Sequence, residues 1–148
     1  MSLLGKIVEF KKRVKSKGTI YIADNTNYLS VKADLYLLCK PYTDSLPKNS
    51  ALAKELSPSL ELYLLKQAKL SKAIFKTDFK EFKEKYLREL QNRIDSINAI
   101  NDIKHMLNQN NTICLFDNCK LEEYCHLNIL GELFQDKGYK VQYIKSKE

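Results

Sequence analysis

The chain has 148 residues, of which 44% are hydrophobic and 29% are charged. This size and balance are typical of one globular domain that buries a core without disulfides or a metal. No apolar run is long enough to cross a bilayer, and the first residues, MSLLGKIVEF, lack the features of a secretory signal. We therefore expect one cytoplasmic domain over residues 1–148, with no membrane partner, whose net charge of +7 favours anionic partners.

The first part of the chain predicts one helix and two strands. Apolar residues recur at helical spacing over residues 3–16, and Gly18 follows as a stop signal. The runs TIYIAD (19–24) and ADLYLLC (33–39) are rich in β-branched, aromatic or aliphatic residues and predict strands, the second covered on both faces. Residues 40–56 contain two prolines and several turn residues, and predict an irregular segment that is either a loop over a site or a plain connection.

Helical signals dominate the middle of the chain. In SPSLELYLLKQ (57–67), Ser57 is expected to cap a helix and Pro58 to occupy its first position. Asp78 and Glu81 have the spacing of a capping box. The apolar stripe that follows predicts one long helix, or two with a kink, and is expected to face the core; it consists of Phe79, Phe82, Tyr86, Leu90, Ile94, Ile97, Ile100, Ile103 and Leu107.

The last part of the chain predicts a strand, a helix and a strand. NTICLF (111–116) is the first strand, the helix starts by about Leu121 and ends at Gly138, and YKVQYIK (139–145) is the second strand. Helices alternate with short apolar strands along the whole chain. This pattern predicts an α/β fold, a single layered domain with a mainly parallel sheet of about four or five strands flanked by helices.

Polar residues follow three of the predicted strands. Asp24 and Asn25 follow the first, Lys40 the second, and Asp117 and Asn118 the third. The carboxyl ends of parallel strands meet at one edge of a sheet, where ligands of α/β proteins usually bind. We expect Asp24, Asn25, Lys40 and Asn118 to bind a ligand and Asp117 to do acid–base work, alone or paired with Asp24, a pair that would also suit a cation. The alternative is ordinary turn and cap chemistry.

The stretch NTICLFDNCKLEEYCHLNIL (111–130) holds three cysteines and a histidine. Cys119 lies in the turn before a helix, where the helix dipole lowers a thiol's pKa, so a nucleophile with His126 as its base is one hypothesis. A metal site of Cys119, Cys125 and His126, with Cys39, is a weaker one, because neighbours on a helix diverge by about 100°. The alternative is packing, with His126 a core histidine bonded to a backbone carbonyl and Cys125 a small apolar residue.

The order of these features resembles the domain of unknown function 488 family. The segments ELSPSLELYLLK, FKEFKEKYLREL and EEYCHLNILGELFQDKGYKVQYI carry the resemblance, which covers about residues 19–145 and is most specific at Cys125 and His126. Leu127 stands where the family has an arginine, and Asp117 and Cys119 where it has a cysteine and a glutamate. The resemblance implies an α/β fold and the location of a site, but no particular reaction or cofactor.

Three functional hypotheses remain open. The chain binds, and in one version acts on, a small anionic ligand such as a nucleotide at the carboxyl ends of its strands. A second hypothesis is nucleic-acid binding through the basic segment KKRVKSK (11–17). The third, motivated by Leu127, is a non-enzymatic interaction module, for example a homodimer, with a vestigial site.

Overall fold

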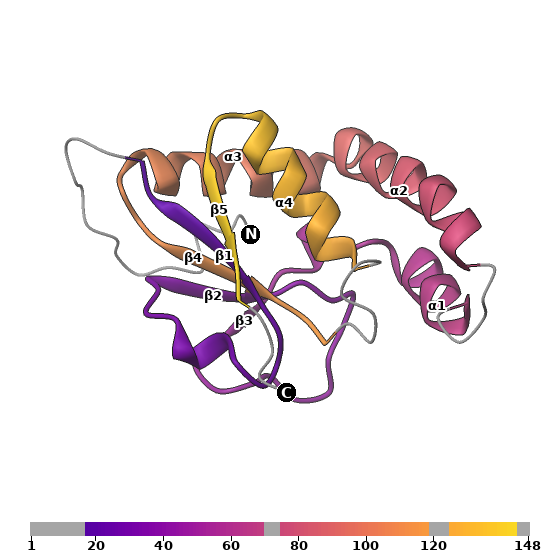
Figure 1. The fold of residues 1–148 in the computed structure, drawn as a ribbon, viewed down its shortest axis with the longest axis horizontal. Coiled ribbons are helices and arrows are strands. Elements are labelled where there is room, and N and C mark those ends of the chain that lie inside the picture. The colour runs from indigo at the N-terminus through magenta and orange to yellow at the C-terminus, as the bar shows by residue number, and fades with distance from the viewer. Residues whose placement is uncertain (1–16, 70–74, 119–124, 145–148) are drawn as a thin grey trace.

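The protein folds around a five-stranded sheet. The computed structural model describes residues 17–69, 75–118 and 125–144. Its strands are β1 (Thr19–Ala23), β2 (Leu35–Leu38), β3 (Ala51–Leu52), β4 (Ile113–Phe116) and β5 (Lys140–Tyr143). They lie in the order β3-β2-β4-β1-β5 and every neighbouring pair is parallel (Figure 1). The predicted α/β fold with a parallel sheet is thus confirmed.

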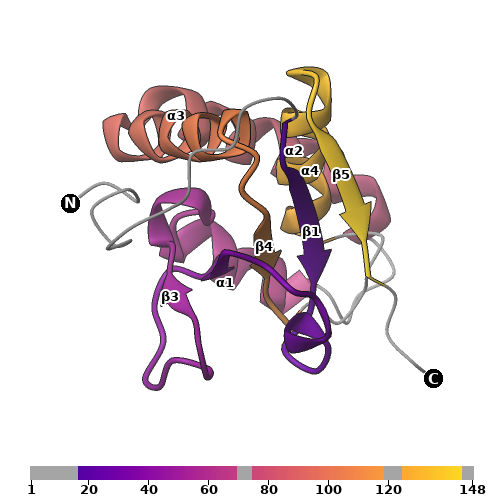
Figure 2. The ribbon, with the colours of Figure 1, turned by 90° about the vertical axis from the view of Figure 1, so that its left-hand side faces the viewer.

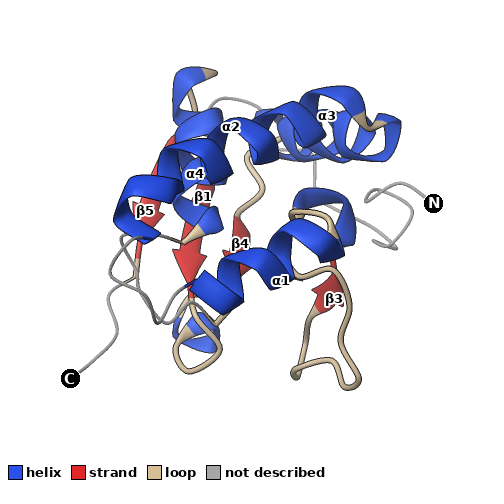
Figure 3. Ribbon diagram, turned by 90° about the vertical axis from the view of Figure 1, so that its right-hand side faces the viewer, coloured by secondary structure: helices blue, strands red, loops and turns tan. Residues whose placement is uncertain are grey.

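Four α-helices cover one face of the sheet. They are α1 (Leu60–Lys69), α2 (Phe75–Asn92), α3 (Ile94–Asn108) and α4 (His126–Asp136), and Figures 2 and 3 show them on the same side of the strands. The main core lies between these helices and the sheet. None of the helices in the described residues is long and apolar enough to cross a membrane.

A smaller cluster covers the other face of the sheet. It consists of Ala23, Tyr28, Leu38, Cys114 and Phe116. Tyr28 comes from a short 3-10 helix, η2 (Tyr28–Ser30), and its ring stacks on that of Phe116 with the centroids 4.0 Å apart. β4 therefore has core on both sides, and all four of its residues are buried, as its purely apolar sequence indicates.

The long helical segment is broken at Arg93. This residue has an extended backbone (φ −87°, ψ 125°) and caps α3. Its guanidinium donates to the carbonyl of Ser57 at 2.8 Å and to Ser96 Oγ at 2.9 Å. Of the two predicted forms, the structure has two helices with a break between them.

The break also corrects the predicted stripe. Ile94 and Ile97 were expected in the core, but they are 71% and 38% exposed. The extended residue at 93 turns α3 relative to α2, so the helical period does not continue across the break. The stripe is buried only at some distance on either side, at Phe82, Tyr86, Leu90, Ile100, Ile103 and Leu107.

Two predicted helix starts are wrong. α1 begins at Leu60, and Ser59 rather than Ser57 caps it, since Ser59 Oγ accepts the backbone N–H of Leu62 at 3.3 Å. Ser57 instead ends the 3-10 helix η3 (Lys54–Leu56) with an extended backbone. α2 begins at Phe75, so Asp78 lies inside the helix and is not a capping residue.

The last helix starts later than predicted and ends as predicted. Cys125 is extended (φ −81°, ψ 137°) and precedes α4, so Cys125 and His126 do not lie one or two turns into a helix that starts near Leu121. At the other end, Gly138 has a φ of 91°. The N–H groups of Gly138 and Tyr139 donate to the carbonyls of Gln135 and Phe134, which is a Schellman motif.

The segment predicted to be irregular contains a strand. β3 pairs its two residues with Leu37 and Leu38 of β2, within residues 40–56. Two residues carry no readable periodicity, so only tertiary pairing defines this strand. The helix predicted at residues 3–16 lies outside the described residues. Gly18 itself is required by close packing, because a Cβ there would lie 1.8 Å from the backbone oxygen of Asn111.

Candidate functional site at the strand ends

Three strands end side by side at one edge of the sheet. In the strand register, Ala23 of β1 and Leu38 of β2 both pair with Phe116 of β4. The next residues along the chain, Asp24, Cys39 and Asp117, therefore stand level at the carboxyl edge, as the sequence predicts. They differ sharply in what they contact.

A pocket opens at this edge. Its cavity has a volume of about 590 Å³ and is lined by Asn25, Lys40 and Asn118 after the three strands, by residues 41–45, and by Leu60, Tyr63 and Leu64 of α1. The first three were predicted to bind a ligand, and the structure brings them to one pocket. Asp24, the fourth, is not among the residues that line it.

The carboxylate of Asp24 is engaged in a local turn. Its Oδ1 accepts the backbone N–H groups of Thr26 at 2.7 Å and of Asn27 at 3.1 Å, and also the Thr26 hydroxyl. Asn27 Oδ1 accepts the N–H of Asp24 in return at 2.8 Å. These contacts are the turn chemistry that the sequence offered as the alternative for this residue.

Asp117 is instead the centre of a buried polar network. It is 1% exposed. Its Oδ1 accepts the backbone N–H of Asn118 at 2.7 Å, and its Oδ2 accepts the hydroxyl of Tyr63, which comes from α1, at 2.9 Å. His126 Nε2 lies 3.5 Å from the same Oδ2. A residue of α1 and the first residue of α4 thus meet at the end of β4.

His126 is wholly buried and bonded to the backbone. Its Nε2 lies 2.8 Å from the carbonyl oxygen of Cys39, and since a carbonyl only accepts, Nε2 carries the proton. The rings of Tyr63 and Tyr86 stand edge-on to the imidazole, with centroids 5.7 and 6.1 Å away. This is the core histidine of the alternative hypothesis, but it also lies beside Asp117, the predicted acid–base residue.

Sequence reasoning missed Tyr63. It is 6% exposed, it lines the strand-end pocket, and its hydroxyl reaches Asp117. Asp117 and His126 do not line the pocket, and Tyr63 and Asn118, which both donate to Asp117, join them to it. The only signal in the sequence was a polar-tipped aromatic within the apolar helix segment LELYLLK. A core tyrosine has the same appearance.

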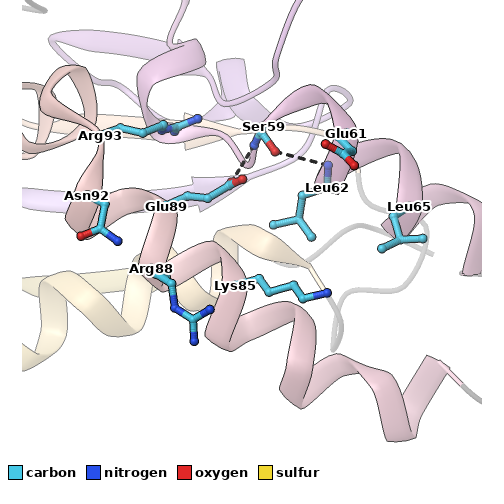
Figure 4. A pocket seen from close by; sticks show the side chains of 9 residues that line it. All are labelled: Ser59, Glu61, Leu62, Leu65, Lys85, Arg88, Glu89, Asn92 and Arg93. Atoms are coloured by element: carbon cyan, nitrogen blue, oxygen red, sulfur yellow. Dashed lines mark hydrogen bonds between the residues drawn. The ribbon is translucent and has the colours of Figure 1, made fainter.

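A second cavity helps to explain how Tyr63 is positioned. It lies between α1 and α2, has a volume of about 540 Å³ and is shown in Figure 4. On its wall, Glu89 of α2 accepts the backbone N–H of Ser59 at 2.8 Å, and Ser59 caps the first turn of α1. This pair of hydrogen bonds holds the start of α1, and with it Tyr63, against the end of β4.

Of the described cysteines, Cys39 and Cys114 are buried free thiols, and Cys125 is disulfide-bonded. Burial, with Asp117 as the next cause, raises the pKa of the Cys39 thiol well above its ordinary value. Burial also raises the pKa of Cys114 to about 12. Cys119, the predicted nucleophile, lies outside the described residues, and within the described ranges no three His, Cys, Asp or Glu residues are grouped to hold a metal.

These features define a small α/β protein with a pocket at the carboxyl edge of a parallel sheet. Residues 12–138 match the family model described as the active DUF488-N3 subclade. The chain therefore belongs to the domain of unknown function 488 family, as the sequence resemblance predicted. No curated protein and no solved structure matches the chain.

Proposed function

We propose that the protein binds a small anionic ligand, such as a nucleotide, in the strand-end pocket. The observation that carries the proposal is the gathering of Asn25, Lys40 and Asn118, from the ends of three different strands, around one cavity of about 590 Å³. Ligand pockets of proteins commonly have volumes of about 300–1,000 Å³. The location is also the usual one for ligands in open parallel sheets.

The electrostatics of the pocket favour an anion at one end. Lys40 supplies an ammonium group to the lining, and Leu60, the first residue of α1, lines the same cavity. The amino end of a helix carries a partial positive charge, which adds to that of the lysine. The amides of Asn25 and Asn118 supply neutral donors and acceptors that would orient the ligand.

The buried network is where chemistry on the ligand would originate. Asp117 accepts the Tyr63 hydroxyl, and Tyr63 also lines the pocket, so the network is joined to the wall of the cavity. We propose Asp117 as the acid–base group, with His126 beside it, and Cys119 as a nucleophile remains a prediction. The description of the matched subclade as active favours a functional site over a vestigial one.

Ligand-induced stabilisation tests the proposal. The unfolding temperature of the purified protein is measured with nucleotides as probes, and a probe present at a hundredfold excess over Kd should add about 2.7 kcal/mol to the free energy of unfolding. Lys40→Ala should remove this gain. Lys80→Ala, which removes the same charge from an exposed position on α2, is the matched control and should keep it. An equal gain in stability in Lys40→Ala and in the Lys80→Ala control would place the ligand elsewhere.

The other hypotheses remain predictions. Of the basic segment 11–17, only Lys17 is described, and its ammonium lies 5.0 Å from the centre of the Tyr139 ring. Nucleic-acid binding that neutralises five phosphates would make log K fall with log salt at a slope of about −4.5. A flat salt response would remove that hypothesis.

A further inference from the structure

A third cavity adjoins the strand-end pocket. This side cavity has a volume of about 300 Å³, and its lining includes Pro41, Lys54, Leu60 and Arg93. Pro41 and Leu60 line the strand-end pocket as well. The two cavities therefore share part of their walls and meet at the start of α1, so that a ligand held in the first can extend into the second.

The side cavity contains a guanidinium that is fixed in place. Arg93 donates from Nε to Ser96 Oγ at 2.9 Å, and from Nη2 to the carbonyls of Ser57 at 2.8 Å and Glu55 at 3.3 Å. Its Nη1 donates to no described residue. The three bonds have already ordered the side chain, so an anion that accepts from Nη1 does not have to order it again.

The other charges of the side cavity favour a singly charged group. The exposed Lys54 adds an ammonium to the lining, but Glu55 and Asp95 also line it. A terminal phosphate carries a charge of about −1.5 to −2 at neutral pH and would be repelled by these carboxylates. A phosphodiester carries one negative charge and keeps two oxygens that can accept hydrogen bonds.

The wall between the two cavities favours an uncharged link between two anionic groups. Lys40 lines the strand-end pocket, Arg93 lines the side cavity, and the residues common to both linings are the apolar Pro41 and Leu60. The phosphate groups of a pyrophosphate share an oxygen and so stay together. In a nucleotide chain a sugar separates each phosphate from the next, and the sugar is neutral.

From these features we infer that the ligand is a 5′-phosphorylated dinucleotide, the smallest piece of a single nucleic-acid strand. Its terminal phosphate lies at Lys40, and its first sugar passes over Pro41 and Leu60. Its phosphodiester accepts from Arg93 Nη1 beside Lys54. The inference rests on the proposed function, since it extends the nucleotide of the strand-end pocket into the side cavity.

The test is calorimetric titration of the full chain with matched probes. They are the four ribonucleoside 5′-monophosphates and the 5′-phosphorylated dinucleotides of the same bases. At least one dinucleotide should bind ten times more tightly than its mononucleotide. Lys54→Ala should weaken that dinucleotide about tenfold, which is about 1.4 kcal/mol, and leave the mononucleotide unchanged. Lys40→Ala should weaken both.

Three controls isolate the phosphodiester contact. Lys80→Ala removes an exposed lysine of α2 that lines neither cavity, and it should change neither affinity. Arg93→Lys keeps the charge but removes Nη1, and it should weaken the dinucleotide alone. Because Arg93 also caps α3, the unfolding temperature of this variant is measured alongside. A dinucleotide with an uncharged methylphosphonate link should bind the wild type no more tightly than the mononucleotide.

The outcomes separate the two proposals. Equal affinities for dinucleotides and mononucleotides, both lost with Lys40→Ala, would overturn the dinucleotide inference and leave the proposed anion site standing. A tenfold preference for the dinucleotide that survives Lys54→Ala, or that the methylphosphonate link retains, would overturn the role of the side cavity. If no mononucleotide and no dinucleotide bound, the inference and the proposed nucleotide site would fail together.

Discussion

Two aspartates at the same edge of the sheet have opposite roles. Asp24 and Asp117 each follow a strand directly, and the register of β1 and β4 places them level with each other. Asp24 bonds to residues two and three positions later in its own turn. Asp117 bonds to Tyr63, which is 54 positions away. Their surroundings differ because β4 is central and covered on both faces, whereas Asp24 begins an exposed turn.

The comparison teaches that position at the carboxyl edge is not enough to make a functional residue. The exposed turn satisfies its carboxylate locally, so Asp24 stabilises a loop. The buried end of β4 surrounds Asp117 with its own backbone and with the helices that pack above it. A carboxylate in that setting bonds to residues of distant elements. Through its bond to Tyr63, which lines the pocket, Asp117 is linked to the pocket wall.

The largest effect is expected from Asp117→Ala. The change leaves the buried Tyr63 hydroxyl and the Asn118 N–H without their acceptor, so the free energy of unfolding should fall by about 3 kcal/mol. Urea denaturation measures the loss. Asp117→Asn, which keeps one acceptor oxygen in the same place, should lose less than half as much. A loss below about 1 kcal/mol for the alanine variant would mean that the network contributes little to the fold.

The buried β4 region should also show a dependence on alkaline pH. The pKa of Cys114 is about 12 in the folded protein against an ordinary value of 9.0, so the unfolded chain loses this proton first. The thiol's contribution to the free energy of unfolding is therefore complete below pH 9 and is lost as the pH rises from 9 to 12. At pH 10 the loss should be about 1.4 kcal/mol. Urea unfolding at pH 8, 9 and 10 should show this extra loss in the wild type and not in Cys114→Ala. Parallel pH profiles for the two proteins would contradict it.

The smallest effect is expected in the exposed turn. Asp24→Ala removes the side-chain acceptor of two backbone N–H groups, one exposed and one partly buried, which should cost about 1 kcal/mol, as for the loss of a helix cap. Asp44→Ala, an exposed aspartate on the rim of the pocket, is the control and should change stability by less than about 0.5 kcal/mol. If Asp24→Ala and Asp117→Ala proved equally costly, the distinction between the two regions would be lost.

The sequence by itself determined the frame of this protein. The apolar runs at β2 and β4 and the alternation of strands with helices predicted the parallel sheet, because burial on both faces demands continuous apolar strands. Asn25, Lys40 and Asn118 come soon after the ends of three predicted strands, and they were therefore expected at the carboxyl edge of the sheet. Gly138 marked the end of α4 because its φ of 91° suits only a residue without a side chain.

Only the tertiary structure decided which polar residues work together. Nothing local distinguishes Asp24 from Asp117, or Tyr63 from a core tyrosine, since their partners lie on other elements. The starts of α1 and α4, the break at Arg93 and the two-residue strand β3 were likewise settled by long-range contacts, which a single sequence does not display. The physical reason is that a hydrogen bond across 54 residues leaves no periodic trace, whereas the burial of a whole strand or helix face does.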